Sequence, residues 1–210
     1  MPNERMGDNY TMRISLLTIE DIVGENGLKS VLNYAHLEKY INNFPPDNDD
    51  VVIPWEDFSR LLHSLSELFG EKGSRSLKLR VGREFGRKVL EGRSGLSAAL
   101  KASTRLLPEK KRVHFILDGF RKESEKKFPS PIGQRLQLID EGDCFLYTDK
   151  DYYGSEGITS KTPVCDAYAG LLQYMVEWIA GHPYKVEEIE CRAMGNPSDV
   201  FRISRVESKD

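Results

Sequence analysis

The chain has 210 residues, of which 39% are hydrophobic and 30% are charged, and its formal net charge is −3. This length supports one substantial hydrophobic core, and the composition excludes an intrinsically disordered chain. No apolar run reaches the ~20 residues of a membrane-spanning helix, and the polar N-terminus lacks the apolar stretch of a signal peptide. We therefore expect a cytoplasmic protein.

The first half of the chain is predicted to be helical. Pro54 suits the first turn of a strongly amphipathic helix, and Gly70 is expected to end it. The predicted helices are, in chain order, residues 27–41, 55–69, 74–92, 94–107 and 110–128. We expect residues 1–54 to form a helical arm that packs on the domain formed by residues 55–210 or on a second subunit.

The basic residues are concentrated in part of this helical half. Residues 72–112 contain thirteen Lys or Arg and only three Asp or Glu. Such a segment can contact nucleic acid or acidic lipid, or it can form helices whose basic faces neutralise acidic residues elsewhere in the same molecule. We favour the second interpretation and expect no direct nucleic-acid binding.

After Pro129 and Pro131 the sequence changes to the alternation of β-strands. Strands are predicted near residues 136–138 and 144–147, a helix follows Pro163, and a hairpin ends the domain. The expected fold class is α+β: a helical N-terminal half packed on a small antiparallel sheet, with a C-terminal helix and hairpin.

The sequence lacks the common catalytic motifs, including a Walker loop, His-Glu-x-x-His, Gly-x-Ser-x-Gly and a dinucleotide fingerprint. The histidines have no ligand spacing, and Gly82-x-x-x-Gly86 lies inside a basic helix, where it has little weight as a motif. We therefore name no catalytic residue and favour a protein that is not an enzyme.

The last hairpin contains a change of parity. Its apolar residues fall first on even and then on odd positions: Tyr184 and Val186, followed by Ile189, Cys191 and Ala193. Alternation with a period of two changes phase only at an extra residue, so a β-bulge is predicted around Glu187 and Glu188. The bulge turns Glu188 toward the face of Cys191.

A hairpin centred near Gly195 also sets Cys191 opposite Asp199, and Cys165 approaches from the preceding helix. These thiols and carboxylates have the ligand types of a zinc site: Cys165, Glu188, Cys191 and Asp199. In the alternative interpretation, both cysteines are small buried hydrophobic residues and both carboxylates face water.

The same part of the chain resembles the 4-vinyl reductase domain family, a set of small hydrocarbon-binding or sensor domains related in fold to transport-particle (TRAPP) subunits. The resemblance covers roughly residues 55–206. It rests on Thr162-Pro-Val-Cys165, Ala169-Gly170, Glu188-x-x-Cys191-x-x-x-Gly195-x-Pro197, Phe201, Gly73-Ser-Arg-Ser-Leu77 and Val81-Gly-Arg-Glu-Phe-Gly86.

Phenol-sensing members of that family hold zinc through three cysteines and a glutamate. The resemblance implies that Cys165, Glu188 and Cys191 are ligands here, with Asp199 in place of the fourth cysteine. Losing one thiolate should weaken the site. The resemblance therefore leaves two alternatives, a structural zinc ion held by two cysteines, a glutamate and an aspartate, or a hairpin that has lost its metal.

The resemblance implies binding of a small hydrophobic or aromatic molecule in a pocket between helices and sheet, and a homodimer. The predicted ligand contacts are Tyr147, Tyr168, Trp178 and His114. The ligand-contacting His and Trp of phenol sensors have no clear counterpart in this chain, which argues against phenol. Two alternatives are a tetrapyrrole carrier or 4-vinyl reductase-type protein of bacteriochlorophyll synthesis, and a dimeric scaffold that binds other proteins.

Overall fold

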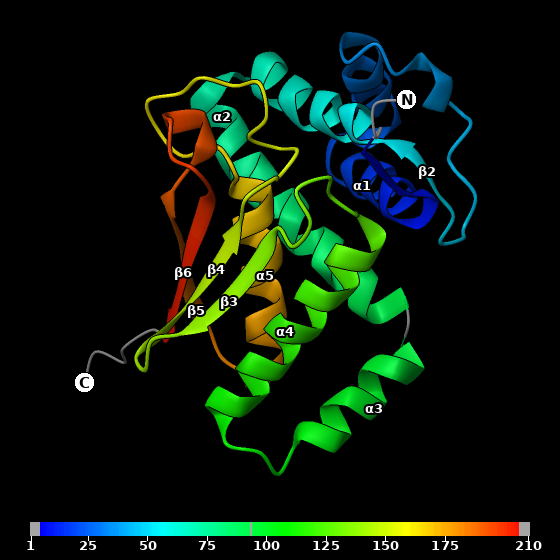
Figure 1. Ribbon diagram of the computed structural model, residues 1–210. Coiled ribbons are helices and arrows are strands. Elements are labelled where there is room, and N and C mark those ends of the chain that lie inside the picture. Colours follow the sequence, from blue (N-terminus) through cyan, green and yellow to red (C-terminus); the bar gives the residue numbers. More distant parts are fainter. Residues whose placement is uncertain (1–4, 93, 206–210) are drawn as a thin grey trace.

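The structure of the protein, a computed structural model, describes residues 5–92 and 94–205 (Figure 1). Its elements are, in chain order, β1 (Met6–Asp8), α1 (Asn9–Tyr34), the 3-10 helix η1 (Glu38–Tyr40), β2 (Val51–Pro54), α2 (Trp55–Gly92), α3 (Ser94–Thr104), α4 (Glu109–Lys127), β3 (Leu136–Asp140), β4 (Cys144–Asp149), α5 (Asp166–Ala180), β5 (Tyr184–Glu190), the 3-10 helix η2 (Arg192–Met194) and β6 (Asp199–Arg205). The predicted α+β class is confirmed.

The main sheet is antiparallel and has the strand order β3-β4-β6-β5. Two hairpins therefore lie side by side, joined through β4 and β6 (Figure 1). The helices α4 and α5 pack on this sheet, and their apolar faces bury Leu117, Leu172 and Val176 against Phe201 and Ile203. We call this cluster the sheet core.

A second cluster, which we call the arm core, joins α1, η1 and β2 to the first half of α2. Trp55 and Phe58 lie at its centre and are almost completely buried. The predicted arm thus shares a core with residues beyond 54, while the division at residue 54 stays a prediction. Residues 1–4 and 206–210, which were assigned to the two predicted domains, lie outside the described residues.

The long helix α2 takes part in both layers. Its backbone departs from helical geometry at Gly70 (φ 69°), where the sequence predicts that one helix ends and another begins. Beyond this kink α2 crosses α5 in backbone contact: a Cβ at Gly82 would lie 1.8 Å from the Ala167 carbonyl oxygen, and one at Gly170 would lie 2.2 Å from the Leu79 carbonyl oxygen. Gly82 is therefore a packing residue, a role that was not predicted from its sequence context.

The basic residues of α2 form ion pairs with acidic residues of other elements, as the favoured interpretation predicted. Arg83 Nη2 lies 2.6 Å from Glu177 Oε2, and Lys88 Nζ lies 2.6 Å from Asp21 Oδ2. Lys78, which is almost fully buried, lies 3.7 Å from Asp166. Among the described residues, no helix is both long and apolar enough to cross a membrane.

Candidate metal centre

Four acidic side chains from different parts of the C-terminal region converge on one point. Each offers one potential ligand atom, and these atoms all lie within 4.8 Å of one another. They belong to Cys165, Glu188, Cys191 and Asp199, the four residues predicted from the sequence. Cys165 precedes α5, Glu188 lies in β5, Cys191 directly follows β5, and Asp199 begins β6.

A β-bulge turns Glu188 and Cys191 toward the same face. Glu188 pairs with Phe201 and Glu190 with Val200, so Ile189 is the extra residue. The bulge exists as predicted, although it lies one residue beyond the predicted pair. Cys191 is not a ladder partner of Asp199, because the hairpin closes through η2, where the Arg192 amide donates a 2.8 Å hydrogen bond to Asp199 Oδ1.

Hydrogen bonds orient three of the four groups. The Cys165 amide donates to Glu188 Oε2 at 2.8 Å, and the Ser155 hydroxyl donates to Asp199 Oδ2 at 2.7 Å. Asn196 Oδ1 accepts from the Cys191 amide at 3.3 Å. Glu188 Oε1 is buried and has no hydrogen-bond partner among the described residues. A cation would satisfy this oxygen, so the donor set fits a metal ion.

The burial of these groups determines which of them carry protons. Burial raises the pKa of Glu188 to about 9 and that of Asp199 to about 6, and it raises the pKa of Cys165 well above its usual value. The pKa of Cys191 is lowered to about 5 because the Cys165 thiol hydrogen-bonds its sulfur. Near pH 7 the cluster therefore holds protons that a cation can replace.

The spacing of the cluster is close to that of tetrahedral zinc. Bonds of about 2.0–2.3 Å to sulfur and oxygen place tetrahedral ligand atoms roughly 3.3–3.8 Å apart. The largest separation in the cluster is 4.8 Å. Small side-chain rotations are therefore sufficient to bring the four atoms into a metal coordination shell.

The predicted ligand contacts occupy different surroundings. Tyr147 and Tyr168 lie in the sheet core, with ring centroids 5.9 Å apart. Trp178 is half-buried, and Lys101 Nζ lies 5.0 Å from its ring centroid. His114 is exposed on α4 and lines an open hollow of about 350 Å³. The two tyrosines thus pack on each other while Trp178 and His114 lie in separate surroundings, so the structure does not gather the set around one enclosed pocket.

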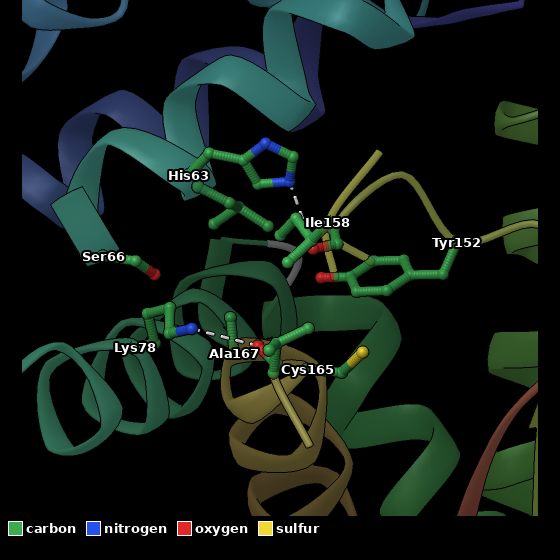
Figure 2. Close-up of a pocket in the computed structure, with 10 residues that line it drawn as sticks. His63, Ser66, Lys78, Tyr152, Ile158, Cys165 and Ala167 are labelled. Atoms are coloured by element: carbon green, nitrogen blue, oxygen red, sulfur yellow. Dashed lines mark hydrogen bonds between the residues drawn. The ribbon is translucent and has the colours of Figure 1, made fainter. Parts of the chain in front are cut away.

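A small cavity adjoins the cysteine end of the cluster (Figure 2). Its walls come from both halves of α2, from the loop after β4 and from the start of α5: Leu62, His63, Ser66, Lys78, Tyr152, Gly154, Ile158, Val164, Cys165 and Ala167. It has room for about one water molecule. His63 Nε2 lies 3.3 Å from the Gly154 carbonyl oxygen, and Lys78 donates to the Val164 carbonyl.

Comparisons with solved structures show the same fold at low sequence identity. An H-NOX protein from K. algicida in the Fe(II) unliganded state has a TM-score of 0.64 and 14% identity, over 97% of this chain and 98% of that chain. The phenol-responsive sensory domain of the transcription activator PoxR, with phenol, has a TM-score of 0.53 and 14% identity, over 77% and 79%. An H-NOX protein from S. oneidensis in the Fe(II)NO state has a TM-score of 0.53 and 14% identity, over 93% and 99%.

No curated protein sequence matches the chain. The family model of the 4-vinyl reductase domain matches residues 155–205, a region that includes all four residues of the cluster. This match confirms the resemblance carried by the motifs around Cys165 and Cys191. The chain therefore contains a 4-vinyl reductase domain, matched at residues 155–205.

Proposed function

We propose that the protein is a sensor domain that binds a small hydrophobic or aromatic molecule and holds a structural zinc ion. The observation that carries the zinc site is the buried cluster of Cys165, Glu188, Cys191 and Asp199. Four protein ligands leave no open position for water, which is typical of a structural rather than a catalytic zinc. Zinc would join the start of α5 to both strands of the last hairpin.

The fold supports the sensor proposal, because one similar structure is a phenol-responsive sensory domain. In this chain we place ligand entry at the cavity of Figure 2. Its wall residue Tyr152 packs on Tyr168 with ring centroids 4.7 Å apart, and Tyr168 in turn contacts Tyr147. A ligand that displaces Tyr152 therefore reaches both predicted tyrosine contacts. Trp178 and His114 stay predicted contacts that this entry path does not involve.

The described residues do not fit haem, which the similar H-NOX structures raise as a second candidate. Haem needs an axial ligand such as histidine beside a space that holds the macrocycle. His63 borders a cavity with room for about one water molecule, and His114 is exposed at an open hollow. We therefore base no function on haem, and the tetrapyrrole alternative stays a prediction.

Zinc binding at pH 7 should release about two protons per ion, because Cys165 and Glu188 have pKa values above 7 and must lose their protons to become ligands. Protons compete with zinc, so affinity should rise with pH. Calorimetry in buffers with different ionisation enthalpies measures this release. The Glu188→Gln variant should release about one proton fewer. A release near zero in the unmodified protein would contradict the proposed ligand set.

Protein purified without denaturation should carry an apolar or aromatic molecule that mass spectrometry detects after denaturation. A ligand at about 100 times its Kd should raise the Tm by roughly 5–10 °C. The Ser66→Leu variant fills the cavity and should lose this shift, whereas Ser103→Leu, at an exposed position of α3, should keep it. Equal shifts in both variants would place the ligand elsewhere, and a tetrapyrrole in the spectrum would favour that alternative.

A further inference from the structure

The loop between β4 and α5 touches the metal centre at one of its residues. Ser155 is 2% exposed, and its hydroxyl donates the hydrogen bond to Asp199 Oδ2. Arg192, which follows the ligand Cys191, donates through Nη1 to the Tyr152 carbonyl at 3.2 Å. Two contacts from the hairpin that bears the cluster therefore hold residues 152–155.

The same four residues dock on the first half of α2. The Ser59 hydroxyl donates to the Tyr153 carbonyl at 2.7 Å, and His63 lies 3.3 Å from the Gly154 carbonyl (Figure 2). The Tyr153 ring packs in the arm core, with its centroid 6.1 Å from that of Trp55 and 5.3 Å from that of Phe58. Residues 152–155 thus have the metal centre on one side and the arm core on the other.

We propose that residues 152–155 transmit the occupancy of the metal centre to the arm core, with Ser155 as the positioning residue. This inference rests on the proposed zinc site. A bound cation fixes the carboxylate of Asp199, and the hydrogen bond from Ser155 then fixes the loop against Ser59 and Trp55. When the cation leaves, Asp199 rotates more freely and this restraint on the loop is lost. The arm core is therefore the output surface of the sensor.

Thermodynamic linkage makes the coupling reciprocal. If zinc tightens the contact between loop and α2, then weakening that contact must lower zinc affinity. Ser59 bonds the loop rather than a metal ligand, so Ser59→Ala should weaken zinc binding about fivefold. A purely local role of Ser59 in packing α2 would leave zinc affinity unchanged.

Fluorescence of Trp55 reports on the arm core once the second tryptophan is replaced in a Trp178→Phe background. Removing zinc with a chelator should increase acrylamide quenching of Trp55 about twofold, following the loss of restraint on Tyr153. Adding Ser155→Ala should leave close to one zinc per chain but abolish most of this response. Ser64→Ala is the matched control, because Ser64 is a buried serine of α2 whose hydroxyl donates to the Leu61 carbonyl of its own helix.

The outcomes are distinguishable. If zinc binds and leaves without changing Trp55 quenching, the coupling is wrong and the zinc site stands. If no zinc binds, both proposals fail. If Ser155→Ala does not fold, Ser59→Ala gives the second reading: an unchanged zinc affinity together with an unchanged chelator response would overturn the coupling.

Discussion

Replacing Cys191 with serine is expected to reduce bound zinc from about one ion per chain to below about 0.1. Cys191 is completely buried at the centre of the cluster, where its lowered pKa supplies a thiolate near pH 7. A serine hydroxyl is a far weaker ligand because it keeps its proton. Folding free energy that depends on zinc is lost with the ion, so the Tm should fall by about 10 °C.

Cys144→Ser is the matched control for this variant. Cys144 lies in β4, is only half-buried, and its sulfur is 3.6 Å from Glu141 Oε2. It is outside the cluster, so its zinc content should match that of the unmodified protein and its Tm should change by no more than about 2 °C. Metal analysis of chelator-free preparations measures the first quantity and thermal unfolding the second. Equal zinc contents in the two variants would exclude Cys191 as a ligand.

Gly82→Ala is expected to destabilise the protein by more than about 3 kcal/mol or to prevent folding. The added Cβ would lie 1.8 Å from the Ala167 carbonyl oxygen, which is backbone and cannot rotate away. The only relief is separation of α2 from α5. Because Ala167 lies two residues after Cys165, such separation would also displace a proposed metal ligand.

Gly73→Ala, in the same helix, should have the opposite sign. Its added Cβ would have only Phe69 Cβ at 3.9 Å, so alanine should stabilise the helix by about 0.5–1 kcal/mol. Chemical denaturation followed by circular dichroism measures both free energies of unfolding. A loss below about 1 kcal/mol for Gly82→Ala would show that the two helices are not held at this distance in solution.

The cluster could be predicted because its information is local. The parity change between Val186 and Ile189 requires an extra residue in the strand, and that residue brings Glu188 and Cys191 to one face. Alternation shows that a bulge exists but not which residue is extra, and this explains the displacement of the prediction from Glu188 to Ile189. The helical half was equally visible, because the apolar spacing of α2 and the stop at Gly70 are properties of adjacent turns.

The remaining features depend on contacts between distant residues. Ser155 and Asp199 are separated by 44 positions, and Ser59 and Tyr153 by 94, so no periodicity links them. The short pair β1–β2 joins residues near positions 7 and 53 and has too few residues for alternation to be detected. The sequence also shows that aromatic residues are present without showing whether they line a cavity or, as with Tyr147 and Tyr168, pack on each other.

The position of β6 has a consequence for synthesis on the ribosome. β6 follows every other strand in the chain, yet it lies between β4 and β5. Until Asp199–Arg205 leaves the exit tunnel, the nascent chain holds β3 and β4 as a two-stranded hairpin with an unpaired edge. Such a hairpin is marginally stable, and its free edge can recruit other chains. The final strand therefore completes the sheet and the proposed metal centre in one step, and until then the nascent chain depends on chaperones to keep that edge from aggregating.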